Sequence, residues 1–335
     1  MRHLIQLFGC AYLLSFLLFS CNREKSVEAG FLVHALDKER WENDVDFFRK
    51  KFQDMGGIVN VQIADNDAEK QLAQARELIA NGIDVLVVVP VDQFTAAKIV
   101  EAAHDAGVKV ISYDRLIKNC KLDYYVSTDN VAIGELQAGY LTKIKPVGNY
   151  ALIGGSKSDN NSQFLYLGQM NILAPFIEKG DLKIVFNVFT EEWAENEGYD
   201  LTKKMLTQLN NKVDAIIAGN DAIASGVITA LKETGLEGKV LVAGMDADLK
   251  NLTEIVKGNQ TCTIYKPYEK LAATAAEIAM KFGRGENYEQ TFQTISNGAR
   301  LVPSFLHNAM LVNKENLKLT VISEGYQKEE EVYKK

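Results

Sequence analysis

The sequence predicts an α/β fold made of two doubly wound parallel-sheet lobes. Short β-branched runs alternate with amphipathic stretches along most of the chain, and several runs are apolar without interruption. The run Val-Leu-Val-Val-Val at 85–89 suits a central parallel strand that is buried on both faces. About nine or ten such strand–helix units exceed one comfortable open sheet. We therefore expect two lobes.

The expected strands recur at regular intervals through the chain. They are Gly30–Leu36, Ile58–Ala64, Val85–Val89, Val108–Tyr113, Tyr150–Ile153, Ile184–Phe189, Ala215–Ala218, Val240–Ala243 and Cys262–Tyr265. The stretches between them have helical spacing. Trp41, Val45, Phe48, Phe52 and Met55 fall three or four residues apart and predict one buried helix face. Because no Pro-, Gly- or Ser-rich linker separates the lobes, we expect several short crossovers with a cleft between the lobes.

The N-terminus has the pattern of a secretory signal. Arg2 and His3 precede an uncharged stretch at 4–19, which is shorter than the roughly 20 residues that span a bilayer. Ser20-Cys21 is followed at once by polar residues, and this resembles a bacterial lipoprotein processing site. We expect a signal peptide at 1–20, lipid on Cys21 and a tether at 21–29. The alternative is a signal anchor in which Cys21 is incidental.

Composition narrows the class of protein. The chain has 335 residues, 47% of them hydrophobic and 24% charged, which excludes a disordered chain and a polytopic membrane protein. A net charge of −7 argues against a nucleic-acid partner, since phosphates need a basic surface. Four cysteines are too few for a disulfide-built fold. Cys120 and Cys262 could pair in an oxidising compartment, but two isolated buried thiols are the favoured reading.

Polar and aromatic residues follow the predicted strands. In open α/β sheets ligands bind beyond the carboxyl ends of the strands, so these residues should converge on one rim. The candidate binding residues are Arg40, Trp41, Asp114, Arg115, Asp159, Asn161, Trp193, Asn220, Asp246 and Lys266. Carboxylates, amides and basic groups together can saturate sugar hydroxyls, and an indole can cover the C–H face of a sugar ring. The set predicts a site for a neutral polyol.

Each candidate also has a simpler structural explanation. Asp221 and Asp248 could be helix N-caps, and Trp41 could serve core packing alone. Asp114 and Arg115 could form only an internal ion pair. Motifs of catalysis are scarce: the first strand is not followed by G-x-G-x-x-G, and 154–158 lacks the glycine that a P-loop needs before its lysine. We expect no catalytic residue, no metal site and no cofactor.

Several motifs together resemble a known family. They include Glu39-Arg40-Trp41, Tyr113-Asp114-Arg115, Asp159-Asn160-Asn161, Asn220-Asp221-Ala222, Asp246-Ala247-Asp248 and Tyr265-Lys266-Pro267. The chain resembles the periplasmic sugar-binding proteins of ABC transporters, which have the type I periplasmic-binding-protein fold, and within them the branch that binds D-xylose. The resemblance spans about Gly30 to Gly325. Departures are His34-Ala35, where the family often has acidic residues, and the segment 189–192.

The resemblance implies an architecture and a role. Three crossovers would form a hinge, with 30–131 and 266–296 in the first lobe, 132–265 and 297–327 in the second, and a charged tail at 328–335. The ten candidate residues would bind one monosaccharide, an aldopentose and D-xylose first, with Trp41 and Trp193 on the two faces of the ring. The protein would be a monomer on the periplasmic face of a bacterial membrane.

The partners that this family implies leave two roles open. The protein would deliver sugar to an ABC permease or, alternatively, present it to a sensor kinase or chemoreceptor. A repressor of related fold would need a DNA-binding region before the first strand, where only the leader and tether lie. A glycosidase would need a positioned carboxylate pair, and saturation of a ligand is the simpler use of Asp114, Asp159 and Asp246.

Overall fold

The computed structural model describes residues 26–36, 39–289 and 293–334. The predicted signal peptide and the lipidation residue Cys21 lie outside these ranges. Within them, none of the helices combines the length and the apolar character needed to cross a bilayer. The two cysteines in the described part, Cys120 and Cys262, are unpaired thiols.

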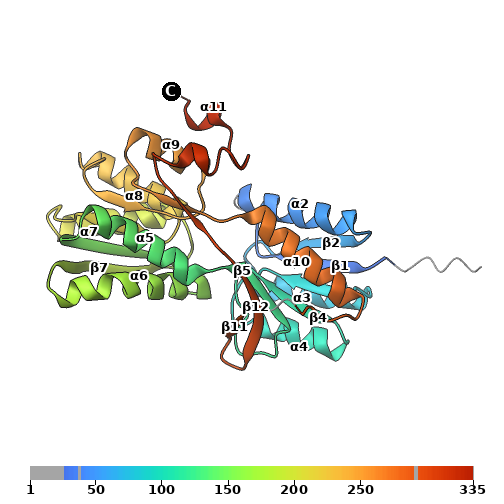
Figure 1. Cartoon of the computed structure of the whole chain (residues 1–335). Coiled ribbons are helices and arrows are strands. Elements are labelled where there is room, and N and C mark those ends of the chain that lie inside the picture. The colour runs from blue at the N-terminus through green and yellow to red at the C-terminus, as the bar shows by residue number, and fades with distance from the viewer. Residues whose placement is uncertain (1–25, 37–38, 290–292, 335) are drawn as a thin grey trace, which may run out of the picture.

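A seven-stranded sheet forms the first lobe (Figure 1). Its strands are β1 (Glu28–Val33), β2 (Ile58–Ile63), β3 (Val85–Val88), β4 (Lys109–Tyr113), β5 (Tyr124–Thr128), β11 (Gln293–Ser296) and β12 (Leu301–His307). Their order across the sheet is β11-β12-β5-β4-β3-β1-β2, and only the β11–β12 pair is antiparallel. We call this sheet and its helices the N-terminal lobe.

Helices cover both faces of this sheet. The helices α2 (Glu39–Asp54) and α10 (Tyr268–Gly283) pack on one face, and α3 (Ala68–Ala80) and α4 (Ala97–Asp105) pack on the other. The predicted apolar face of α2 is confirmed, because Trp41, Val45, Phe48 and Phe52 are all buried. Two-sided burial also explains why Val85–Val88 contains no polar residue.

The second lobe contains a four-stranded parallel sheet of order β7-β6-β8-β9. Its strands are β6 (Gly148–Ser156), β7 (Leu182–Thr190), β8 (Ala215–Ala218) and β9 (Leu241–Ala243). The helices α5 (Asn130–Ile144) and α6 (Asn160–Glu178) cover one face, and α7 (Glu195–Gln208) and α8 (Asp221–Glu233) cover the other. We call this sheet and its helices the C-terminal lobe. The prediction of a parallel α/β fold is confirmed.

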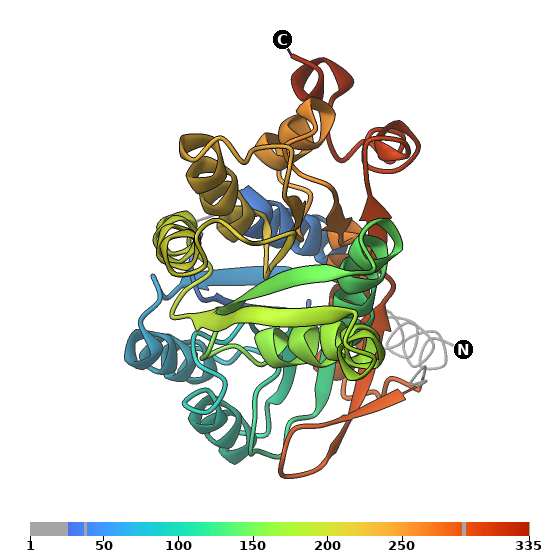
Figure 2. The same cartoon turned by 90° about the vertical axis from the view of Figure 1, so that its left-hand side faces the viewer.

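The remaining elements extend the C-terminal lobe. Strand β10 (Thr263–Tyr265) joins β9 through a bridge between Ala243 and Cys262, and pairs antiparallel with β13 (Met310–Val312). The helix α9 (Leu249–Lys257) precedes β10, and the short η1 (Leu317–Leu319) and α11 (Glu329–Val332) follow β13. Figure 2 shows the dark-red C-terminal segment beside the orange α9, and Val332 of α11 is fully buried in this contact. Part of the charged tail is therefore packed.

The chain passes between the lobes at three places. One lies between β5, which ends at Thr128, and α5, and a second lies between β10, which ends at Tyr265, and α10. The third differs from the expected boundary, because β12 pairs in parallel with β5 and thus extends the N-terminal lobe to His307. The third crossing lies between β12 and β13, not at Asn297. At the other end, β1 begins at Glu28, inside the segment expected as a tether.

Candidate functional site

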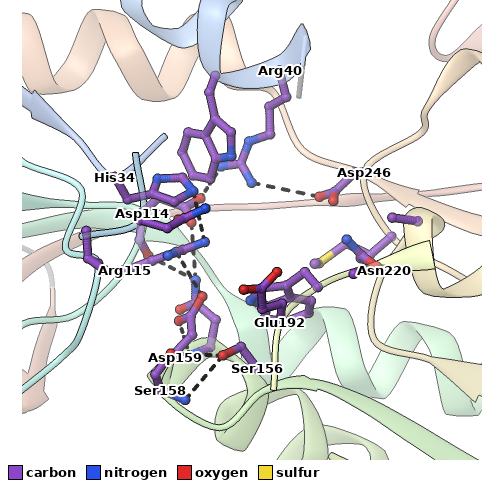
Figure 3. Close-up of a pocket in the computed structure, with 18 of the residues that line it drawn as sticks. His34, Arg40, Asp114, Arg115, Ser156, Ser158, Asp159, Glu192, Asn220 and Asp246 are labelled. Atoms are coloured by element: carbon purple, nitrogen blue, oxygen red, sulfur yellow. Dashed lines mark hydrogen bonds and ion pairs between the residues drawn. The ribbon is translucent and has the colours of Figure 1, made fainter. Parts of the chain in front are cut away.

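A cavity of about 420 Å³ lies between the two lobes (Figure 3). All ten candidate residues from the sequence line it, together with others from both sheets. The N-terminal lobe contributes side chains that follow β1 and β4, and the C-terminal lobe contributes those that follow β6, β7, β8 and β9. Lys266 lies where the chain crosses from β10 to α10. The carboxyl ends of the strands in both lobes therefore face the same space, as the topology predicts.

The loop after β4 places two opposite charges in the cavity. Asp114 has a φ of 60°, a conformation that residues with side chains seldom adopt. Three side chains hold it there, since its main-chain carbonyl accepts hydrogen bonds from Tyr125 at 2.9 Å, Ser127 at 2.7 Å and Asn161 at 3.3 Å. The turn leaves the Asp114 carboxylate and the Arg115 guanidinium side by side in the cavity (Figure 3).

Each basic side chain of the cavity meets a carboxylate. Arg40 donates to Asp114, Arg115 Nε lies 3.0 Å from Asp159 Oδ2, and Lys266 Nζ lies 2.9 Å from Asp246 Oδ1. These residues are buried or nearly so. Three buried cations are thus paired with three buried carboxylates, and the exposed Glu191, Glu192 and Glu195 also line the cavity. The alternative of an internal ion pair between Asp114 and Arg115 is not what forms, because the two charges have different partners.

Burial and pairing shift the acid–base behaviour of these groups. Burial disfavours the Arg40 charge, but Asp114, Tyr268 and Asp44 outweigh it and raise the pKa of Arg40 well above its usual value. Burial also works to raise the pKa of Asp114, yet Arg40 and Lys266 together lower it. For Asp159 burial prevails over Arg115, and its pKa is raised. The Arg40–Asp114 pair is therefore charged across the ordinary pH range.

The two tryptophans come from opposite lobes. Trp193 follows β7, and its ring lies so close to Gly155 that a Cβ there would sit 2.1 Å from the indole. A glycine is required at that position for the ring to pack on the backbone. Trp41 is buried on α2, with the Arg40 guanidinium 4.1 Å from its ring centre. Trp41 belongs both to the core and to the cavity lining.

Three polar residues of the C-terminal lobe sit at helix starts. Asp159 caps α6 by accepting from the Asn161 amide at 2.9 Å, and Asn220 caps α8 by accepting from the Ile223 amide at 2.9 Å. The Asn161 side chain reaches across to the N-terminal lobe and donates to Asp114 Oδ1 at 3.2 Å. Capping and cavity lining are therefore compatible roles, since each residue uses different atoms for them.

Sequence reasoning missed several lining residues. His34 directly follows β1, and its Nε2 lies 3.2 Å from Arg115 Nη2, so the imidazole accepts from the guanidinium. Ser156 ends β6 and donates to the Glu191 carbonyl at 2.6 Å. Both stand at the carboxyl end of a strand, and the rule used for the other residues would have found them. The remaining lining residues are Asn66, Val91, Ser158, Glu191, Glu192, Ala194, Glu195, Ala222 and Met245.

A comparison with known protein families shows which family the chain belongs to. Residues 29–287 match the family model described as a periplasmic binding protein domain. The chain belongs to the periplasmic binding protein family. This periplasmic binding protein is 42% identical over 308 residues to the D-xylose-binding periplasmic protein of Escherichia coli K12, covering 92% of this chain and 93% of that protein.

Two further relatives support the same placement. The D-xylose-binding periplasmic protein of Haemophilus influenzae is 41% identical over 314 residues, with 94% of each chain covered. A solved structure of a carbohydrate transporter solute-binding protein from Chloroflexus aurantiacus, in complex with D-glucose, superimposes with a TM-score of 0.85 at 29% identity, covering 92% of this chain and 98% of that one. The relatives are binding proteins rather than enzymes.

Proposed function

We propose that this periplasmic binding protein binds an aldopentose, D-xylose first, and delivers it to the membrane permease of an ABC transporter. The pairing of the buried charges in the cavity carries the proposal. Arg40, Arg115 and Lys266 each have a carboxylate partner, so an ionic ligand would leave one buried charge without compensation. A neutral polyol avoids this cost and offers hydroxyl groups that both donate and accept.

The residues assigned to the sugar have separate roles in this proposal. Asp114, Asp159 and Asp246 accept from sugar hydroxyls, while Arg40, Arg115 and Lys266 donate to them. Asn161 and Asn220 supply amides, and Trp41 and Trp193 cover the two faces of the ring. Because these groups are charged or desolvated, a sugar with one hydroxyl misplaced leaves a partner unpaired at a cost of about 1–3 kcal/mol.

D-xylose is the first ligand to test because two relatives above 40% identity are named for it. The related structure with D-glucose makes a hexose the main competitor. The experiment is a thermal-shift screen of the purified protein against aldopentoses and aldohexoses, followed by calorimetry. A ligand that binds only the folded state raises the melting temperature by mass action. Tighter binding of D-glucose than of any pentose would contradict the proposed selectivity.

Transport and sensing use the same binding step and need a separate test. For transport, a strain lacking this gene should lose uptake of radiolabelled D-xylose at low external concentration. For sensing, uptake should persist while a sugar-dependent response is lost. We expect loss of uptake.

The proposed location is the periplasmic face of a membrane, with lipid on Cys21. The polar switch after Ser20-Cys21 supports this placement. Replacement Cys21→Ser should move the protein from the detergent phase to the aqueous phase, because one thioether-linked lipid anchor is lost. Unchanged partitioning of Cys21→Ser would contradict lipidation, and Cys262→Ser serves as the matched control.

A further inference from the structure

Behind the cavity, Tyr268 contacts three of its charged residues without lining it. Tyr268 is the first residue of α10 and is 1% exposed. Its hydroxyl donates to Asp246 Oδ1 at 3.1 Å. Its ring centre lies 4.4 Å from the Arg40 guanidinium and 5.7 Å from Lys266 Nζ. The Tyr268 side chain therefore interacts with the Asp246 carboxylate through its hydroxyl and with the Arg40 and Lys266 cations through its ring.

Asp246 needs such support because its backbone is unusual. Its φ is 111°, and the following Ala247 has a φ of 58°, values that residues with a Cβ rarely take. Two phenols fix this turn: Tyr268 through the carboxylate, and Tyr326 through the Asp246 carbonyl at 3.4 Å. Tyr326 belongs to the C-terminal segment, and its ring packs 5.9 Å from that of Tyr268.

The Tyr268 hydroxyl keeps its proton in this setting. Burial raises the pKa of Tyr268 well above its usual value, and the Asp246 carboxylate raises it further. The phenol is therefore a donor at every ordinary pH. The hydrogen bond also joins the lobes, since Tyr268 belongs to α10 of the N-terminal lobe and Asp246 follows β9 of the C-terminal lobe.

We propose that Tyr268 is a positioning residue, which aims the Asp246 carboxylate through its hydroxyl and the Arg40 guanidinium through its ring toward the bound ligand. The inference rests on the proposed function, because the ligand used to test it is D-xylose. Tyr268 itself makes no contact with the sugar. It acts through the two charged residues that do, and it couples their aim to the closed arrangement of the lobes.

The test compares the wild-type full chain with Tyr268→Phe and Tyr268→Leu by calorimetry with D-xylose. Tyr268→Phe keeps the ring and removes one hydrogen bond to a charged group, so we expect about tenfold weaker binding. Tyr268→Leu also removes the face on which Arg40 rests, and should bind more weakly still. The control Tyr199→Phe loses an exposed hydroxyl bond to Glu233 at 2.9 Å and should bind within about twofold of wild type.

A panel of mono-deoxy analogues of D-xylose separates positioning from general loosening. Wild type should discriminate strongly against the analogue that lacks the hydroxyl held by Asp246, and Tyr268→Phe should lose that discrimination selectively. Equal weakening for every analogue, or wild-type affinity in Tyr268→Phe, would overturn the inference. Should Tyr268→Leu fail to fold, Tyr268→Phe still decides. Absence of sugar binding by the wild type would instead refute the proposed function.

Discussion

Arg115 shows how one side chain of the cavity serves several partners. Its Nε faces Asp159 at 3.0 Å, one Nη reaches the Pro90 carbonyl at 3.3 Å, and the other meets His34. These contacts use the planar fork of the guanidinium, which a lysine could not reproduce. These contacts fix the orientation of Arg115, so little side-chain entropy would be lost when its guanidinium donates to a ligand.

We expect Arg115→Ala to weaken D-xylose binding by at least about 100-fold, which corresponds to about 2.7 kcal/mol. The loss combines the missing donor with an Asp159 carboxylate left buried without its cation. Calorimetry measures the effect, and circular dichroism checks that the fold persists. Arg49→Ala is the control, because Arg49 lies outside the cavity lining and pairs with the exposed Asp46. Near-native affinity in Arg115→Ala would remove Arg115 from the site.

Asp44 gives a pH dependence whose sign can be worked out. Burial raises its pKa to about 6, against opposing effects of Arg40 and Tyr113. The unfolded chain takes up this proton only near pH 3.8, so the folded state binds more protons between these values. Stability from this group therefore grows as pH falls through 6 and is lost as pH rises through it.

Comparison of wild type with Asp44→Asn by urea unfolding isolates this effect. Between pH 7 and pH 5 the wild type should gain on the order of 1 kcal/mol relative to the variant, because the amide does not titrate. A free-energy difference that stays constant over this range would show that Asp44 is ionised in the folded protein at pH 5.

The sequence predicts which residues line the cavity, because they follow the ends of strands. It does not predict which of their side chains pair with one another. All ten candidates follow strand ends and do line the cavity. Nothing in the sequence indicates that Arg40 pairs with Asp114, since the two are 74 positions apart. Tyr268 was missed for the same reason: a tyrosine at the start of a helix has no pattern that marks it as a partner of Asp246.

At the scale of elements, the Trp193 ring packs against two glycines at the carboxyl ends of neighbouring strands. Gly155 in β6 and Gly219 after β8 bring their backbones against the indole, and a Cβ at Gly219 would lie 3.1 Å from it. The ring therefore rests directly on the sheet edge. The segment 189–192, which departs from the family pattern, leads into this ring. Its Glu191 and Glu192 amides donate to Glu197 at 2.7 and 2.9 Å.

We expect Gly155→Ala to displace Trp193 and to weaken sugar binding by about tenfold or more, since its Cβ would lie 2.1 Å from the ring. Calorimetry and tryptophan emission would report the change. Gly139→Ala is the matched control: nothing lies within 4 Å of its Cβ, and alanine favours the helix α5 by about 0.5–1 kcal/mol. Unchanged affinity in Gly155→Ala would mean that the indole does not cover the sugar.

Four strands escaped prediction, each for a physical reason. Strand β5 has the sequence Tyr-Tyr-Val-Ser-Thr and is fully buried. Its serine and threonine do not look like residues of a buried strand, but the Ser127 hydroxyl can be buried because it donates to the Asp114 carbonyl. Strands β11 and β12 form an edge hairpin, and Pro303 within β12 argues against a strand by local rules. Strand β13 has three residues. The wrong third boundary follows directly from missing β12.

At the scale of the whole molecule, the contacts between lobes are opposite in charge. The N-terminal lobe presents Arg40 and Arg115, and the C-terminal lobe presents Asp246 and Asp159 to them, at 3.9 and 3.0 Å. Asn161 adds a hydrogen bond to Asp114 across the same gap. Each of these contacts joins the two lobes, so together they stabilise the arrangement in which the lobes meet around the cavity. A sugar that contacts both lobes would stabilise the same arrangement further.

If these cross-lobe contacts stabilise the closed arrangement, removing one of them should increase the radius of gyration of the unliganded protein. Asp159→Asn removes the ion pair with Arg115 but keeps an oxygen to cap α6, so the two lobes remain folded. We expect the unliganded variant to have a larger radius of gyration than unliganded wild type by small-angle X-ray scattering, because open forms gain population. Saturating D-xylose should bring wild type to its most compact form and require higher concentrations in the variant. Glu233→Gln, which weakens an exposed pair with Lys203 inside the C-terminal lobe, should leave the radius unchanged. Equal radii for unliganded wild type and Asp159→Asn would show that the cross-lobe charges do not hold the lobes together.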